Sequence, residues 1–435
     1  MSMLVIACLV IMLGVLLLMR MPVAFIFLLV STIGIAEIRG LDSALGLLGS
    51  RLYNIGSTYS LTVLPFFILM GHLAYESGIT EELYVAARAW LGRLKGGLVL
   101  ATTMANAAFA AACGETMAAT AVFGKVAIPE MLRYGVNRKL AAGSVATAGT
   151  LAAMIPPSLS IIVFAILAHL SVARLLIAGI LPGLLTAVCY GIMVYLRVLK
   201  NPSLAPRLPD VTWRERGRAI KGTWGIFSLV VLVIGGLFAG FFTPTEAGAV
   251  GAGGAFILLL VRKGRTSPKS IREAFLGSAR TTSVVCIVLV GAMLFASFLA
   301  LSGASAAISH YVISLDLPPY VLVGGFMVIL IALGCIVDPL SMMFLTVPII
   351  VPPLIEMGIN PIWLGILVVK TNEIGMITPP LGLNAYMLKN VVPDFSMGEI
   401  FGGIWWFLQV EIVTMIILMF FPQISLWLPG VMFGG

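Results

Sequence analysis

The sequence predicts an all-α polytopic membrane protein built from two inverted repeats. Of its 435 residues, 60% are hydrophobic and 10% are charged, whereas soluble domains carry about 25% charged residues. The segment from Ile128, IPEMLRYGVNRKLAAGSVATAGTLAAMIPPSLSII, aligns without a gap with the segment from Val351, VPPLIEMGINPIWLGILVVKTNEIGMITPPLGLNA, at an offset of 223 (351 − 128). Paired Pro-Pro interruptions in two halves of a hydrophobic chain indicate the midplane binding site of a secondary transporter.

Apolar runs of roughly 20 residues are long enough to cross a bilayer as helices. Two longer runs, about 96–132 and 318–355, carry a break at Glu115 and at Asp338 and are interpreted as re-entrant hairpins, since non-helical backbone at membrane depth needs protein or water around it. The Pro-Pro segments predict broken helices at about 138–170 and 362–391. The predicted crossings are 3–19, 22–39, 57–75, 138–170, 174–198, 224–242, 244–262, 279–302, 362–391 and 399–421.

Lysine and arginine residues predict the orientation of these crossings. The loops 197–221 and 262–280 carry seven and six basic residues and belong in the cytoplasm. When the crossings are counted outward from these loops, the first hairpin enters from the cytoplasm and the second from the opposite face. Each half has five crossings, and an odd number of crossings inverts the second copy. Arg39 and Arg51 then lie outside, against the rule that basic residues gather in cytoplasmic loops. The predicted divisions are a first repeat over 1–200, a cytoplasmic linker over 201–221 and a second repeat over 222–435.

Several other classes of protein are not predicted. The net charge of +8 comes from short loops rather than from one basic face, so nucleic acid is not an expected partner. Five cysteines and three histidines are scattered without metal or redox spacing, and neither HExxH nor GxSxG occurs. The chain is therefore not expected to be an enzyme.

The two hairpin breaks carry equivalent carboxylates. Glu115 aligns with Asp338 at the same offset (338 − 115 = 223). An ionised carboxylate at helix-centre depth costs about 2.5–3.5 kcal/mol. Two at matching positions therefore predict a polar cavity shared by both halves, although a helix cap at each break is an alternative interpretation.

The Pro-Pro sites predict ligands for an ion and a substrate. Each proline removes an N–H group, and the carbonyls it frees suit a small hard cation, while the next half-helix N-terminus favours a carboxylate. A kink used only for packing is the alternative. Nearby side-chain oxygens belong to Thr147, Thr150, Ser158, Thr371, Asn372, Glu373, Thr378 and Asn384, among which Ser158, Asn372, Glu373 and Asn384 are the candidate substrate contacts.

The chain resembles the large permease subunit of tripartite ATP-independent periplasmic (TRAP) transporters over nearly its whole length. The resemblance is carried by the two repeated segments with their flanks, LLIAGILPGLL and FFTPTEAGAVGA. It implies sodium-driven uptake of an organic acid delivered by a periplasmic binding protein, an elevator mechanism, a separate small four-helix permease subunit and a bacterial inner-membrane location. By position it implicates Gly114, Glu115, Thr116, Thr147 and Pro156 in one sodium site, and Asp338, Thr371, Thr378 and Pro379 in another.

One departure concerns the first hairpin tip. The family has a Ser- and Gly-rich run there, whereas this chain reads Cys113-Gly114-Glu115-Thr116-Met117. The additional carboxylate predicts either sodium binding, proton titration or repulsion of an anionic substrate. A stand-alone sodium:dicarboxylate-type symporter of the same architecture is the alternative function.

Overall fold

The computed structural model describes residues 12, 14–15, 21–209, 211–264 and 268–434. Helices make up 84% of it, and these residues contain no strand. Five helices are long and apolar enough to cross a membrane alone, or up to eight spans if each of three bent pairs is one. The chain is therefore a multi-pass membrane protein, as predicted; the expected crossing over 3–19 lies outside the described residues except for 12 and 14–15.

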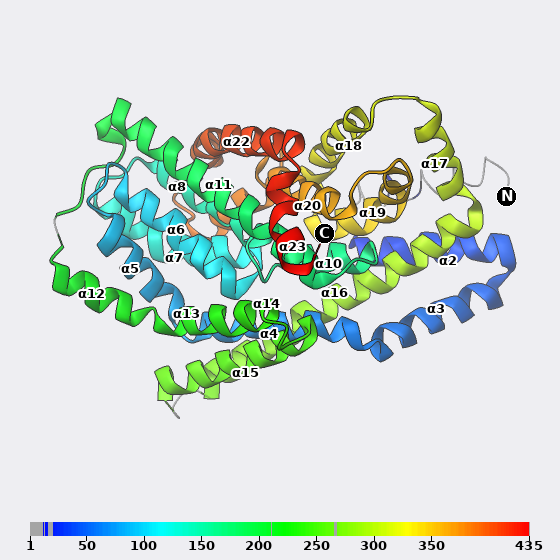
Figure 1. Cartoon of the computed structure of the whole chain (residues 1–435), viewed down its shortest axis with the longest axis horizontal. Coiled ribbons are helices and arrows are strands. Elements are labelled where there is room, and N and C mark those ends of the chain that lie inside the picture. The colour runs from blue at the N-terminus through cyan, green and yellow to red at the C-terminus, as the bar shows by residue number, and fades with distance from the viewer. Residues whose placement is uncertain (1–11, 13, 16–20, 210, 265–267, 435) are drawn as a thin grey trace.

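A first group of helices forms the lower part of the molecule in Figure 1. Helix α4 is central to it, because α15 and α16 both pack against α4, while α2 and α3 pack against α16. A π-helical turn, η3, interrupts the run from α13 to α14. The bounds are α2 Val23–Arg39, α3 Leu41–Ser57, η1 Tyr59–Thr62, α4 Val63–Glu76, α13 Trp224–Val230, η3 Val231–Gly235, α14 Gly236–Phe238, α15 Pro244–Lys263 and α16 Pro268–Ser302.

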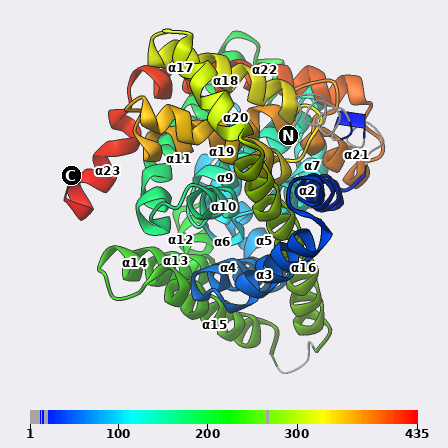
Figure 2. The ribbon, with the colours of Figure 1, turned by 90° about the vertical axis from the view of Figure 1, so that its right-hand side faces the viewer.

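A second group of helices lies above the first in Figure 1 and contains every candidate site residue. Its short helices α9 and α10 lie at the middle of the view in Figure 2, where α10 contacts α19 and α20. The bounds are α6 Gly97–Cys113, α7 Thr116–Arg133, α8 Arg138–Ala148, α9 Leu151–Met154, α10 Leu159–Leu167, α11 Val172–Lys200, α18 Pro319–Gly334, α19 Pro339–Glu356, α20 Pro361–Ile377, α21 Leu383–Val391, α22 Met397–Phe420 and α23 Gln423–Phe433.

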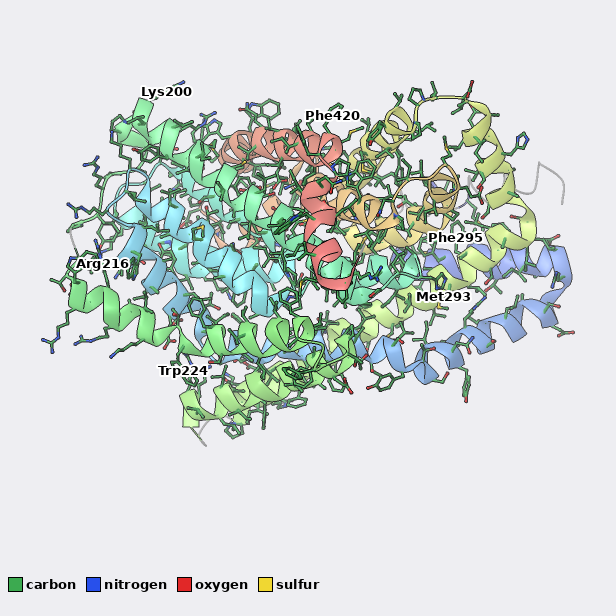
Figure 3. The ribbon with its side chains drawn as sticks, viewed as in Figure 1. Lys200, Arg216, Trp224, Met293, Phe295 and Phe420 are labelled. Carbon is green, nitrogen blue, oxygen red and sulfur yellow. The ribbon has the colours of Figure 1, made fainter. Side chains whose placement is uncertain are left out.

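Shorter helices connect these groups. Helix α5 (Ile79–Leu91) follows α4 and packs on α6, and α17 (Ala304–Ser314) follows α16 and packs on α19. The predicted linker contains η2 (Pro202–Leu204) and the polar helix α12 (Trp213–Gly222), where Thr212 and Glu215 form a capping box. Lys200 and Arg216 both lie toward the left end of the molecule in Figure 3, Lys200 at the top and Arg216 lower down.

The same local features recur in both halves of the structure. Helices α7 and α19 each have 18 residues and begin 223 positions apart (339 − 116). Asn137 accepts bonds from two backbone N–H groups at the start of α8, and Asn360 does the same at the start of α20. Both Pro-Pro peptide bonds are cis. The repeat read from the sequence thus extends to helix ends, whereas the opposite direction of its two copies stays a prediction.

The structure also differs from the expected spans. Helix α3 was not predicted and forms a pair with η1 and α4 bent by 63°. Its three glycines and polar residues dilute the apolar pattern. Helix α16 begins at Pro268 rather than at 279, because its first turns are polar. Helix α19, expected as one arm of a hairpin, is itself long and apolar enough to cross a membrane.

Candidate functional site

The first hairpin tip is the two-residue connection between α6 and α7. Gly114 has φ +64, and a Cβ there would meet the carbonyl oxygen of Pro157 at 2.3 Å. Only glycine fits this backbone conformation and this close approach. The N–H of Leu159 donates to the Gly114 carbonyl at 3.1 Å. The tip is therefore fastened to the first Pro-Pro loop, which brings together Gly114 and Pro156-Pro157 as the sequence analysis expected.

Glu115 caps the helix that follows it. Its carboxylate accepts a hydrogen bond from the Ala118 N–H at 3.0 Å, and its own backbone is extended. Negative charge at a helix N-terminus is stabilised by the first free N–H groups and the helix dipole. The geometry is that of the cap that the sequence left as an alternative, while a role in sodium binding remains a prediction.

The second tip has the same cap and different packing. Asp338 accepts a hydrogen bond from the Ser341 N–H at 3.0 Å at the start of α19. The Nδ2 group of Asn372 donates to the Pro339 carbonyl at 3.3 Å. This tip is thus fastened to α20 ahead of its Pro-Pro loop, whereas the first tip contacts the loop itself.

The hydroxyl groups near both loops bond to nearby carbonyls. Ser158 accepts from the Ile161 N–H at 3.2 Å, capping α10, and donates to the Ala153 carbonyl. Thr378 donates to the Ile374 carbonyl at 2.6 Å, and Thr371 to the Leu367 carbonyl at 2.7 Å. Thr147 likewise donates to the Gly143 carbonyl at 2.6 Å. Each of these hydroxyl groups already donates its proton to a carbonyl. Its oxygen can therefore still bind a cation, but it has no proton left to donate to an acid.

Three of the four predicted substrate contacts present a buried oxygen without a donor. Glu373 is 1% exposed; one of its oxygens accepts from the Thr116 hydroxyl at 3.0 Å, and the other, Oε1, has no partner. Asn384 donates to the Ala146 carbonyl at 3.0 Å, and its Oδ1 is unpartnered, as is that of Asn372. Buried acceptors without partners are uncommon and require an explanation such as an ion or water. Hard oxygen ligands of this kind suit small cations.

A cavity of about 250 Å³, the tip cavity, lies where the first tip meets α4. A Cβ at Gly71 of α4 would come within 2.8 Å of the Cys113 carbonyl oxygen, so the two helix groups touch at this point. Polar groups on the wall come from Glu115, Lys125 and His72. Of the predicted site residues, only Gly114 and Glu115 line this cavity; the others do not, namely Thr116, Thr147, Pro156, Ser158, Asp338, Thr371, Asn372, Glu373, Thr378, Pro379 and Asn384.

The structure contains a buried charged network that was not predicted from the sequence. Lys370 of α20 forms an ion pair with Glu411 of α22, and donates to the Thr186 hydroxyl at 2.9 Å. The Tyr190 hydroxyl also donates to Glu411, as does the Thr150 hydroxyl at 3.3 Å. Both charged side chains are at most 2% exposed. The signal was present, because ionisable residues inside apolar segments are costly and rarely without a role.

Among the described residues, no group of three or more histidine, cysteine, aspartate or glutamate side chains is arranged to hold a metal ion. A sodium ion would instead use carbonyl, hydroxyl and amide oxygens, which are the groups present at both tips and loops.

Comparison with known proteins agrees with this architecture. Residues 10–424 match the family described as "Tripartite ATP-independent periplasmic transporter, DctM component". The chain belongs to this family. It is therefore a TRAP transporter large permease subunit rather than an enzyme, and its resemblance to that family is confirmed.

Its relatives include permeases for different acids. The chain is 36% identical over 389 residues to the C4-dicarboxylate TRAP transporter large permease protein DctM of Pseudomonas aeruginosa, covering 88% of this chain and 89% of that one. It is 28% identical over 376 residues to the sialic acid TRAP transporter large permease protein SiaM of Vibrio cholerae, covering 86% and 87%. The fold resembles the YdaH transporter of Alcanivorax borkumensis, with a TM-score of 0.62, 14% identity and coverage of 88% and 89%.

Proposed function

We propose that this TRAP permease subunit takes up an organic acid through the bacterial inner membrane by sodium-coupled transport, with an elevator mechanism. The tip cavity carries the proposal. It is bounded by the first tip and Pro-Pro loop of the second helix group and by α4 and Thr281 of the first group. A substrate bound there touches both groups, so movement of one group past the other changes the side from which it is reached.

The unpartnered oxygens support sodium as the coupling ion. Asn372 and Glu373 present them on α20 and Asn384 on α21, inside the second helix group. The sequence predicted all three as substrate contacts, but none of them lines the tip cavity, so in this proposal they support the ion sites rather than the substrate. In this proposal one ion is held by Gly114, Glu115, Thr116, Thr147 and Pro156, and a second by Asp338, Thr371, Thr378 and Pro379.

The charges of the tip cavity give a reason for coupling. Lys125 supplies a positive charge for a carboxylate, while Glu115 on the same wall repels it. A sodium ion beside Glu115 offsets that repulsion, so the acid binds more tightly once sodium is bound. The relatives named for C4-dicarboxylates and sialic acid share a carboxylate, and that group is the proposed recognition feature.

Uptake into proteoliposomes tests this function. The permease, its small four-helix partner and its periplasmic binding protein are reconstituted together, and uptake of succinate and of sialic acid is measured with and without an inward sodium gradient. We expect uptake that requires the gradient and both partners. Uptake by the permease alone would favour the stand-alone symporter, and uptake indifferent to sodium would contradict the proposed coupling.

A further inference from the structure

A second and larger cavity lies between the same two helix groups. Its volume is about 1050 Å³, and its wall includes Arg51 and Asn54 of α3, Met293 and Ser297 of α16, and Pro348 of α19. Figure 3 shows Met293 on the right-hand half of the molecule, away from Lys200 and Arg216 at the left end. We name this larger cavity the Arg51 cavity. By the predicted orientation it opens on the side opposite the cytoplasmic loops.

The Arg51 cavity and the tip cavity lie one after the other along three shared helices. On α10, Leu159 lines the tip cavity and Ala165 lines the Arg51 cavity. On α4, Gly71 lines the first and Val63 the second, a separation of about 12 Å along a helix. On α16, Thr281 lines the tip cavity and Met293 lines the Arg51 cavity. The two spaces therefore form successive positions along one interface.

Arg51 gives the larger cavity a positive wall without a paired anion. One of its terminal nitrogens donates to the Ser297 hydroxyl at 2.9 Å, while its Nε is buried without a partner. No carboxylate of the described residues forms an ion pair with it, and no aspartate or glutamate lines the cavity. A guanidinium offers paired donors in one plane, which match the two oxygens of a carboxylate. A buried donor that lacks an acceptor costs free energy.

We propose that the Arg51 cavity is a carboxylate-binding site, at which the guanidinium holds the acid before it reaches the tip cavity. The site rests on the proposed function for its substrate, whereas its selectivity for anions rests on Arg51 alone. It explains why a basic residue lies on the outer side, where it breaks the charge rule that the other loops follow. Asn54 and Ser60, also on the cavity wall, supply further polar contacts for the acid.

A single cysteine at Ser60 reports on this site in the reconstituted complex. The five native cysteines are replaced, Ser60→Cys is introduced, and its reaction rates with an anionic and a cationic methanethiosulfonate are compared. We expect the anionic reagent to be favoured, and Arg51→Gln to lower the anionic-to-cationic rate ratio about tenfold, while Arg51→Lys preserves most of it. An unchanged ratio in Arg51→Gln would overturn the proposal, whether or not uptake is observed.

Two controls distinguish a carboxylate site from a purely structural arginine and from a lipid site. Ser297→Ala removes the hydrogen bond between α3 and α16 but keeps the guanidinium, and we expect it to leave the ratio unchanged; an equal fall would make Arg51 structural only. Succinate or sialic acid, whichever is taken up, should slow labelling, with an apparent dissociation constant about tenfold higher in Arg51→Gln. Protection by phosphatidylglycerol in the vesicle but by neither acid would assign the cavity to lipid and contradict the proposal.

Discussion

Glu115 is a single residue with one observed role, as a helix cap, and one proposed role, in sodium binding. Its carboxylate caps α7 through the Ala118 N–H, and the same side chain lines the tip cavity. The cap uses one hydrogen bond accepted by the Glu115 carboxylate. A cation in the tip cavity would interact with the negative charge of the same carboxylate. The two tasks are separable because glutamine retains an acceptor for the cap and loses the charge.

Glu115→Gln should weaken sodium binding. We expect the apparent sodium affinity of uptake to fall about tenfold, equivalent to about 1.4 kcal/mol, with a loss of stability of about 1 kcal/mol or less from the weaker cap. Sodium titration of uptake and thermal unfolding of the same variant measure both. Glu215→Gln makes the same change at the start of α12, away from both cavities, and should leave the sodium response intact. A normal sodium response in Glu115→Gln would restrict Glu115 to capping.

The ion pair between Lys370 and Glu411 gives a second prediction. Lys370→Met should destabilise the protein by about 3–5 kcal/mol, because it leaves a carboxylate buried without its countercharge. Replacing both residues with methionine should recover most of the loss, since neither charge then remains to be desolvated. Thermal unfolding of the single and double variants in detergent is the measurement. A double variant as unstable as the single one would show that Thr186 and Tyr190 depend on the pair for their packing.

The sequence predicted some of these residues and not others. Glu115 and Asp338 were found because a carboxylate at each break stands out against an apolar run. Lys370 and Glu411 also stand out as charges inside apolar runs, but their pairing joins α20 to α22, and no local pattern encodes that contact. The sequence did not decide whether each carboxylate caps a helix or binds an ion, since both roles require the same residue type at the same place.

At the scale of elements, the helix breaks are where the sequence was most informative. The breaks predicted at Glu115 and Asp338 lie between α6 and α7 and between α18 and α19, while the re-entrant character of these two helix pairs stays a prediction. Helices α3 and α12 were missed because they are partly polar and gain their stability from packing against α16 and α5. Periodicity and hydropathy do not record such contacts.

Breaking of the second Pro-Pro helix should be required for ion binding. Replacing Pro379 and Pro380 with alanine restores two N–H donors next to the end of α20 and permits the helix to continue. We expect sodium dependence of uptake to be lost while the protein still folds and inserts. Pro182→Ala, at a proline inside α11, is a matched control that should retain it. Normal sodium dependence in the double variant would show that the kink serves packing.

For the whole molecule, the proposed function depends on how the two helix groups lie relative to each other. Both cavities lie between the groups, and every candidate ion ligand lies in the second one. The sequence predicted the repeat and the membrane class from composition and spacing. It did not predict the cavities, because each is built from residues of several helices far apart in the chain.

In the proposed architecture the two repeats face opposite sides of the membrane, so that their tips serve opposite faces. Arg133 and Glu356 test it most directly, because they end α7 and α19 at equivalent positions (356 − 133 = 223) and both are exposed. Single cysteines at these positions, in a background without native cysteines, are labelled with a membrane-impermeant thiol reagent. The account predicts that the cysteine at Glu356 reacts in intact cells and the one at Arg133 only after permeabilisation. Reaction of both from the same face would contradict it.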